Sequence, residues 1–157
     1  MLDKRKFYIN GKWIEPSKKN DFEVINPSNE ETFAVISLSS KEDVDLAVKV
    51  SKNAFESWKE TTKEERIKLL ENLLSVYKKR FSEMTEAISK EMGAPMDWSS
   101  NVQNASGQAH LEDFIIRLKN FKFDEQFDSK SNNQIFYEPI GVCGLITPWN
   151  WPINQIA

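Results

Sequence analysis

The residues with the clearest capacity for chemistry lie near the end of the sequence, in the run Thr147-Pro148-Trp149-Asn150-Trp151-Pro152. The two prolines restrict φ on either side of Trp149 and Asn150, so an indole and a carboxamide are presented from a main chain with little freedom. The run follows an apolar stretch, residues 141–146, that is typical of a strand in a parallel sheet covered on both faces. Open α/β sheets hold ligands at the carboxyl ends of such strands, so the position favours a binding site. Asn150 would also be a good N-cap for a helix beginning at Trp151-Pro152, and the residues alone favour this capping role.

Two other residues could carry chemistry, the single cysteine, Cys143, and the single histidine, His110. Cys143 lies inside the apolar stretch with no adjacent base or cation to activate its thiol, so we expect a small buried hydrophobic side chain and not a nucleophile. His110 lies on a predicted helix without a matching nucleophile and is expected to be structural or exposed. One cysteine and one histidine cannot form a disulfide or a tetrahedral Cys/His zinc site within the chain, so no metal is predicted.

The composition is that of a folded domain. Of the 157 residues, 39% are hydrophobic, and 21 basic side chains oppose 24 acidic ones, which argues against both disorder and nucleic acid as a partner. No apolar region of a secretion signal and no stretch of about 18 apolar residues is present, so no membrane association and a cytoplasmic location are expected. The five glycines form neither a Gly-x-Gly-x-x-Gly nor a Gly-x-x-x-x-Gly-Lys nucleotide motif.

The first 40 residues are predicted to be short strands. Asn10-Gly11 lies between residues 7–9 and 12–14, and this pair predicts a hairpin because it suits the positive φ angles of a type I′ turn. Two further strands are predicted, at Val24-Ile25-Asn26-Pro27 and over residues 32–38, separated by a polar turn.

Three helices are predicted next. Ser40-Lys41-Glu42-Asp43 resembles a capping box that begins the first helix, and Thr62-Lys63-Glu64-Glu65 begins a long second helix that Gly93 ends. The spacing in the second helix also fits a coiled coil, but a core helix of a larger protein is the better interpretation. Pro95 begins the third helix, which we expect to end near Asn120. The main apolar positions of the second helix are Ile67, Leu70, Leu74, Tyr77, Phe81, Met84 and Ile88.

The last part of the sequence changes character. Residues 121–133 are charged and polar, and within them Asp128-Ser129-Lys130-Ser131-Asn132-Asn133 predicts an exposed connection between two strands. Residues 135–140 are expected to be extended, and the apolar stretch 141–146 follows. The apolar faces of the helices require a partner sheet, of which this sequence supplies little.

Three blocks together resemble the amino-terminal portion of the NAD(P)-dependent aldehyde dehydrogenases. They are Phe7-Tyr8-Ile9-Asn10-Gly11-Lys12-Trp13, Val24-Ile25-Asn26-Pro27 and the long run from Glu138-Pro139-Ile140-Gly141-Val142-Cys143-Gly144 to Pro152, and they occur in the family's order and spacing. The resemblance covers nearly the whole chain, and its last block is highly specific. It implies an α/β fold, the amino-terminal part of an aldehyde dehydrogenase, with three leading helices and an incomplete, Rossmann-like nucleotide-binding sheet.

The resemblance also implies roles for the candidate residues. Asn150 would be the catalytic asparagine, whose amide donates to the oxyanion formed when a cysteine thiolate attacks an aldehyde, and this role does not exclude capping. Ile146, Thr147, Pro148 and Trp149, together with Asn150, would line the cleft for NAD or NADP. The family's cofactor lysine, glycine turn, glutamate base and cysteine nucleophile lie in later segments that this sequence does not contain.

The sequence therefore predicts part of an oxidoreductase that converts an aldehyde to a carboxylic acid, inactive as these 157 residues alone. Residues 1–120 would belong to the cofactor domain, 121–138 would form strands of the family's oligomerisation type, and 139–157 would hold the first strand of the nucleotide-binding sheet and the start of a truncated helix. The alternative is a non-catalytic assembly partner of a complementary fragment or of a full-length dehydrogenase, within a homo-oligomer. A helical binding module over residues 40–120 is the weakest interpretation because it leaves the Pro148-Trp149-Asn150 block unexplained.

Overall fold

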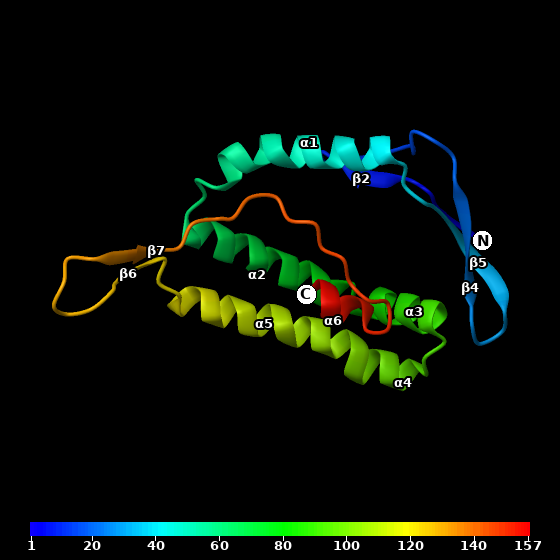
Figure 1. The fold of residues 1–157 in the computed structure, drawn as a ribbon. Coiled ribbons are helices and arrows are strands. Elements are labelled where there is room, and N and C mark those ends of the chain that lie inside the picture. Colours follow the sequence, from blue (N-terminus) through cyan, green and yellow to red (C-terminus); the bar gives the residue numbers. More distant parts are fainter.

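The computed structural model describes residues 1–157. Figure 1 shows a layer of helices with small sheets at its two ends, and α1 lying apart from the other helices. The strands at one end are β1 (Leu2–Lys4), β4 (Asp21–Asn26) and β5 (Glu31–Ser37), in the order β1-β5-β4. β1 pairs with β5 in parallel, and β4 and β5 form an antiparallel hairpin with a bulge between Val24 and Ile25.

The predicted amino-terminal hairpin is confirmed. β2 (Phe7–Ile9) pairs antiparallel with β3 (Lys12–Ile14), and Ile9 lies opposite Lys12. Asn10 and Gly11 have φ values of 53° and 73°, the left-handed conformations that a two-residue turn of this type needs. The two predicted strands after the hairpin are also present, as β4 and β5.

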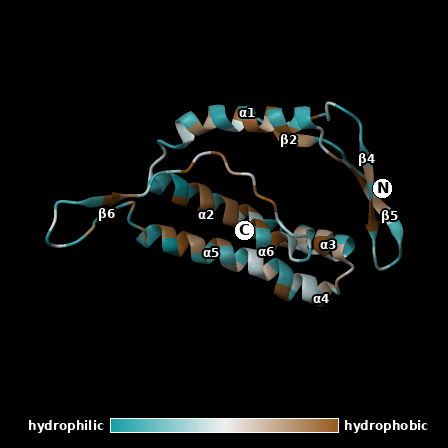
Figure 2. Ribbon diagram, in the orientation of Figure 1, coloured by the Kyte–Doolittle hydropathy of each residue, from teal (hydrophilic) through white to brown (hydrophobic).

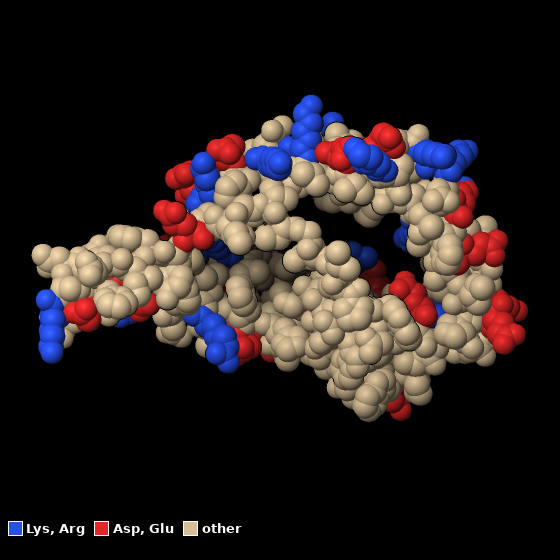
Figure 3. All heavy atoms as spheres, in the orientation of Figure 1, with Lys and Arg blue, Asp and Glu red and all other residues tan.

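Helix α1 (Lys41–Trp58) begins at the predicted capping box. The Asp43 N–H donates to Ser40 Oγ over 3.3 Å, and Asp43 Oδ2 accepts from the Ser40 N–H over 2.9 Å. Asp43 Oδ1 also accepts from the Ser17 N–H over 2.9 Å, which ties the preceding loop to the helix. These main-chain donors hold the pKa of Asp43 below its ordinary value. Charged side chains gather on the outer face of α1, and a hollow separates α1 from the rest of the molecule (Figure 3).

The prediction of one long helix over residues 62–93 is wrong in one respect, because the structure has two helices there. These are α2 (Lys63–Lys79) and α3 (Phe81–Met92), and Arg80 between them has φ −105° and ψ 16°. The Phe81 carbonyl accepts from Asn104 Nδ2 at 2.7 Å and from Thr85 Oγ1 at 3.0 Å. Side-chain donors at a helix carbonyl bend the axis, and such a bend leaves no trace in apolar spacing. The predicted ends, the Thr62 capping box and the left-handed Gly93 (φ 66°), are confirmed.

The third predicted helix occupies the expected residues but is not uniform. It consists of α4 (Met96–Trp98), the π-helical turn η1 (Ser99–Asn104) and α5 (Ala105–Asn120). Asn104 and Ser99 have no exposed surface. The Asn104 side chain donates to Thr85 Oγ1 over 2.8 Å, and the Tyr77 hydroxyl donates to the Asn104 carbonyl over 2.8 Å. Asn104 therefore joins η1 to both α2 and α3.

The core is thin. Most of it lies where α2 and α3 face η1 and α5, and β5 adds Ala34 and Val35. Only 14 of 157 residues are buried. Figure 2 shows hydrophobic residues along α1 and α2, and some of them, such as Val44 and Leu73, are about half exposed. This exposure agrees with the prediction that the apolar faces of the helices require a partner sheet. The buried apolar residues are Ala34, Val35, Tyr77, Ile88, Leu111, Ile115 and Leu118.

A two-stranded ribbon projects from the other end of the molecule (Figure 1). It consists of β6 (Asp124–Gln126) and β7 (Gln134–Phe136), paired antiparallel. Phe127 and Phe136 are each 64% exposed, so the ribbon presents aromatic surface.

Residues 141–146 do not form the buried strand that their apolar pattern predicts. The segment from residue 137 to 148 has no regular structure, and Leu145 and Ile146 are 82% and 99% exposed. A strand needs a neighbour for its N–H and C=O groups, and no other strand of this chain pairs here. The prediction that Cys143 is buried is wrong for the same reason, because its thiol is exposed. The chain ends with the short helix α6 (Pro152–Ile156), and none of the helices combines the length and the apolar character needed to cross a membrane.

Candidate functional site

The candidate site is the exposed segment of residues 146–150 that leads into α6. Ile146 is 99% and Trp149 78% exposed, and Asn150 is also exposed. The main-chain groups of this segment make no hydrogen bonds with other main-chain groups. The segment therefore offers apolar side chains and unsatisfied donors and acceptors together, a combination that suits a flat ring with a polar ribose.

The structure does not support the capping role that the residues alone favoured for Asn150. Trp151 is the N-cap residue of α6, and no side chain caps this helix. The Asn150 carboxamide makes no hydrogen bond within the chain, whereas its main-chain carbonyl accepts one from Gln103 Nε2 over 3.3 Å. The carboxamide is thus free to donate to a ligand.

Helix α6 is anchored to the long helix of residues 96–120. His110 Nε2 lies 2.7 Å from Asn154 Oδ1, and the Trp98 and Trp151 rings meet edge to face with centroids 6.4 Å apart. Gly107 allows close approach, since a Cβ there would lie 2.8 Å from Ile153 Cγ1. The exposed His110 confirms the expectation of a structural or surface histidine, and here it holds α6.

Beneath this contact Tyr77 supports the site from α2. A Cβ at Gly107 would lie 2.8 Å from the Tyr77 hydroxyl, and that hydroxyl donates to the Asn104 carbonyl. Burial raises the pKa of Tyr77 to about 12, so the hydroxyl stays protonated and remains a donor at neutral pH. It therefore acts as a fixed part of the support and not as an acid or base.

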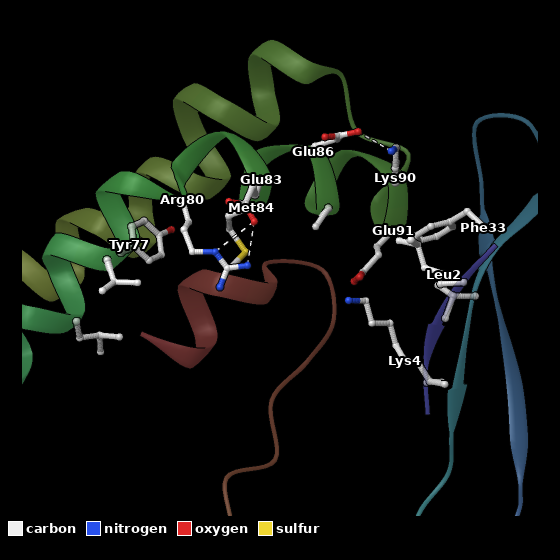
Figure 4. A pocket seen from close by; sticks show the side chains of 16 residues that line it. Leu2, Lys4, Phe33, Tyr77, Arg80, Glu83, Met84, Glu86, Lys90 and Glu91 are labelled. Carbon is white, nitrogen blue, oxygen red and sulfur yellow. Dashed lines mark hydrogen bonds and ion pairs between the residues drawn. The ribbon is translucent and has the colours of Figure 1, made fainter. Parts of the chain in front are cut away.

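A cavity of about 710 Å³ lies elsewhere, between α2 and α3 on one side and β1 and β5 on the other. Figure 4 shows its mainly apolar lining, with Lys4 and Glu91 pointing toward one another across it. Its other charged groups form ion pairs within α3 or at its start, Arg80 with Glu83 and Lys90 with Glu86. It contains no nucleophile, and partial burial raises the pKa of Glu91.

Sequence reasoning assigned Asn150 and the residues before it to one candidate site, but it missed the residues that hold this segment. Gln103, Gly107 and His110 recur at spacings of four and three, a helical face that contacts residues 150–154. An apolar α-helical period instead groups Trp98, Val102, Ala105 and Ala109 on one face. Gln103, Gly107 and His110 are not apolar, so an apolar period could not identify the contacting face.

The fold and the Pro148-Trp149-Asn150 segment together define a class of protein. The profile of the aldehyde dehydrogenase family matches residues 13–157, and the chain belongs to this family. The family predicted from the sequence is thus confirmed, and so is the mixed α/β fold of its amino-terminal part.

Particular relatives match nearly the whole chain. The chain is 42% identical over 158 aligned residues to a 3-succinoylsemialdehyde-pyridine dehydrogenase of a Pseudomonas species, covering 100% of this chain and 32% of that protein. A crystal structure of aldehyde dehydrogenase from Bartonella henselae superposes with a TM-score of 0.97 at 50% identity, over 99% of this chain and 33% of that one. A mutant of aldehyde dehydrogenase C from Pseudomonas syringae, crystallised with NAD+ and octanal, gives a TM-score of 0.92 at 36% identity, over 97% of this chain and 31% of that one. The chain spans about a third of the length of these relatives.

Proposed function

We propose that this chain supplies the oxyanion donor and part of the cofactor cleft of an NAD(P)-dependent aldehyde dehydrogenase that oxidises an aldehyde to a carboxylic acid. The observation that carries the proposal is Asn150. Its main chain is held through Gln103 and α6, while its carboxamide has no partner in the chain and lies on an exposed segment. A donor with these properties is prepared to meet charge on a substrate oxygen.

The chemistry of Asn150 follows from its amide. When a thiolate adds to an aldehyde carbon, the carbonyl oxygen takes up negative charge, and the Asn150 Nδ2–H donates to it. Removing one such donor typically costs about 2.7–4 kcal/mol of transition-state stabilisation. By the family resemblance, the attacking cysteine and the glutamate base come from other segments of the enzyme. Cys143 is exposed and without a neighbouring base, so we do not assign it this role.

Residues 146–150 fit a nicotinamide cofactor, NAD or NADP. Ile146 and Trp149 present apolar surface, and the unpaired main-chain groups around Thr147 and Pro148 can meet ribose hydroxyls. When bound, the nicotinamide accepts the hydride that leaves the substrate carbon. The relative crystallised with NAD+ and octanal supports this assignment.

These 157 residues alone are expected to be inactive, because the reaction also needs a nucleophile and a base. The test is a fusion of residues 1–157 to the remaining two thirds of the Bartonella henselae enzyme, which is 50% identical over the shared part. Reduction of NAD+ or NADP+ is measured with a panel of aldehydes that includes octanal. Activity in the fusion and none in the isolated chain is the expected result.

A matched pair of variants tests the role of Asn150 in that fusion. Asn150→Ala should lower kcat by about 100- to 1,000-fold. Asn154→Ala removes a nearby asparagine of α6 that contacts His110 instead, and it should retain most of the activity. Equal kcat values for Asn150→Ala and the parent fusion would contradict the proposed role.

An assembly role is the second candidate, and the thin core favours it. Large apolar side chains on α1, α2 and the β6–β7 ribbon are exposed, including Val44, Leu73 and Phe136. Such surfaces are typical of chains that associate. In this proposal residues 1–120 join the cofactor domain, 121–138 pair between subunits, and 139–157 provide the first strand of a completed sheet. Separate expression of residues 1–157 and the rest of the Bartonella relative, followed by mixing and size-exclusion chromatography, tests it; the absence of a joint peak would contradict it.

A further inference from the structure

Gln103 has a buried side-chain amide that makes a single hydrogen bond. Its side chain is 4% exposed, and Nε2 donates to the Asn150 carbonyl oxygen over 3.3 Å. Oε1 accepts no hydrogen bond in the structure. A buried amide with an unsatisfied acceptor destabilises a fold relative to an apolar side chain of the same size. The one interaction that its polar end does make is with the main chain of the candidate catalytic residue.

The π-helical turn η1 explains how Gln103 reaches Asn150. Trp98 contacts Trp151 and Gln103 contacts Asn150, although the two side chains are five positions apart. In an α-helix five positions correspond to a rotation of about 140° beyond a full turn, so these side chains would diverge. In a π-helical turn, whose hydrogen bonds join residues i and i+5, five positions come close to a full turn, so the two side chains lie nearer to the same face. The turn therefore directs both side chains at the same short segment.

The contact also has a particular place along the chain. On the carboxyl side of Asn150, the His110–Asn154 and Gly107–Ile153 contacts hold α6. On the amino side, residues 144–149 are exposed and lack main-chain hydrogen bonds. Gln103 is thus the last fixed point before the free segment, and the Asn150 carboxamide extends from that point.

We propose that Gln103 is a positioning residue that fixes the main chain of Asn150 and so aims its carboxamide, with the π-helical turn Ser99–Asn104 as the device that directs it. The catalytic consequence rests on the proposed function of Asn150, whereas the hold on the segment does not. Gln103 touches neither substrate nor cofactor in this assignment. Its effect passes through the Asn150 carbonyl.

Amide hydrogen exchange of the full 157-residue chain tests the hold directly. Gln103→Leu removes the donor and keeps the volume, and Gln103→Met repeats the change with a more adaptable side chain. The Gln155 and Ala157 amides donate to the Trp151 and Ile153 carbonyls in α6. In both variants the exchange of these two amides should quicken by about three- to tenfold. Gln108→Leu is the matched control, since Gln108 is on the same helix but donates to Glu112 over 3.0 Å.

The thermal midpoint separates positioning from a purely structural role. The Gln103 variants should keep or raise the midpoint, because an apolar side chain replaces a buried amide, while α6 exchange alone quickens. A lowered midpoint with exchange quickened equally throughout the chain would overturn the proposal. Unchanged α6 exchange in both variants would overturn it as well.

The fusion with the Bartonella henselae segment adds a kinetic measurement. Gln103→Leu should lower kcat by about three- to tenfold with KM unchanged, since a misaimed donor affects the transition state and not substrate binding. If Asn150→Ala leaves kcat unchanged, the proposed function fails even where exchange confirms the hold. If Asn150→Ala lowers kcat but Gln103→Leu changes neither kcat nor exchange, only the positioning role fails.

Discussion

Replacing Gly107 by alanine adds one methyl group at the place where α5 meets α6, and the structure assigns two opposing effects to it. The new Cβ would lie 2.8 Å from both Ile153 Cγ1 and the Tyr77 hydroxyl, and 3.1 Å from Ile153 Cγ2. Contacts this short require neighbours to move, and overpacking of this kind costs about 1–3 kcal/mol. Alanine in the middle of a helix gains about 1 kcal/mol over glycine. The net expectation is a loss of about 0–2 kcal/mol, concentrated in the docking of α6.

Urea unfolding and amide exchange measure the two effects separately. We expect Gly107→Ala to leave α5 protected and to quicken exchange at Gln155 and Ala157, whose amides close α6. Ala109→Gly, at an exposed position of the same helix, provides the helix-propensity effect without the contact and should cost about 1 kcal/mol. If Gly107→Ala instead gains the full 1 kcal/mol or so and leaves α6 exchange unchanged, the close approach of Ile153 to α5 is refuted.

Three further predictions concern other parts of the chain. Asn104→Leu should lower the free energy of unfolding, measured by urea titration, by about 1–3 kcal/mol. The reason is that it removes the donor to Phe81 O and Thr85 Oγ1 at a site with no exposed surface. Asn101→Leu, at an exposed position of the same π-helical turn, is the control and should change the free energy of unfolding little. The main-chain amides of Ser40 and Ser17 lower the pKa of Asp43 from 3.8, so its contribution to stability is present above about pH 4 and is lost as pH falls through the lower folded-state pKa. In Asp43→Asn the thermal midpoint should therefore fall less steeply as the pH is lowered below about 4. A thermal midpoint with the same pH dependence as the parent chain would contradict the assignment. Cys143 should react with a maleimide in the folded 157-residue chain as fast as in urea and become protected in the fusion, where the segment gains neighbours; a slow reaction in the isolated chain would show that residues 141–146 are covered.

The elements that the sequence predicted well are those whose stabilising partners lie a few residues away. The Asn10-Gly11 turn, the Ser40 and Thr62 capping boxes and the left-handed Gly93 all depend on contacts within one or two turns of chain. The family could also be predicted from a short segment, because Pro148-Trp149-Asn150 and the residues around it form a motif that is specific to the aldehyde dehydrogenases. The role of Asn150 within that run stays a prediction.

The features that sequence reasoning missed depend on distant residues. The break at Arg80 and the π-helical turn at residues 99–104 share one buried partner, Asn104, which donates to the Phe81 carbonyl across the helix interface. An apolar period of three and four residues continues through both irregularities, so it contains no sign of them. Gln103 was overlooked because its side chain is polar, and an apolar period does not mark polar positions.

The sequence by itself determined the local elements, the family and the identity of the residues offered for chemistry, because capping, turn and motif signals act over a few positions. Only the tertiary structure decided which residues hold Asn150, since Gln103 and Asn150 lie 47 positions apart in the chain. The tertiary structure also decided that residues 141–146 form no strand and that Cys143 is exposed. Apolar side chains alone do not form a strand, because the hydrogen bonds of a strand belong equally to the neighbour beside it.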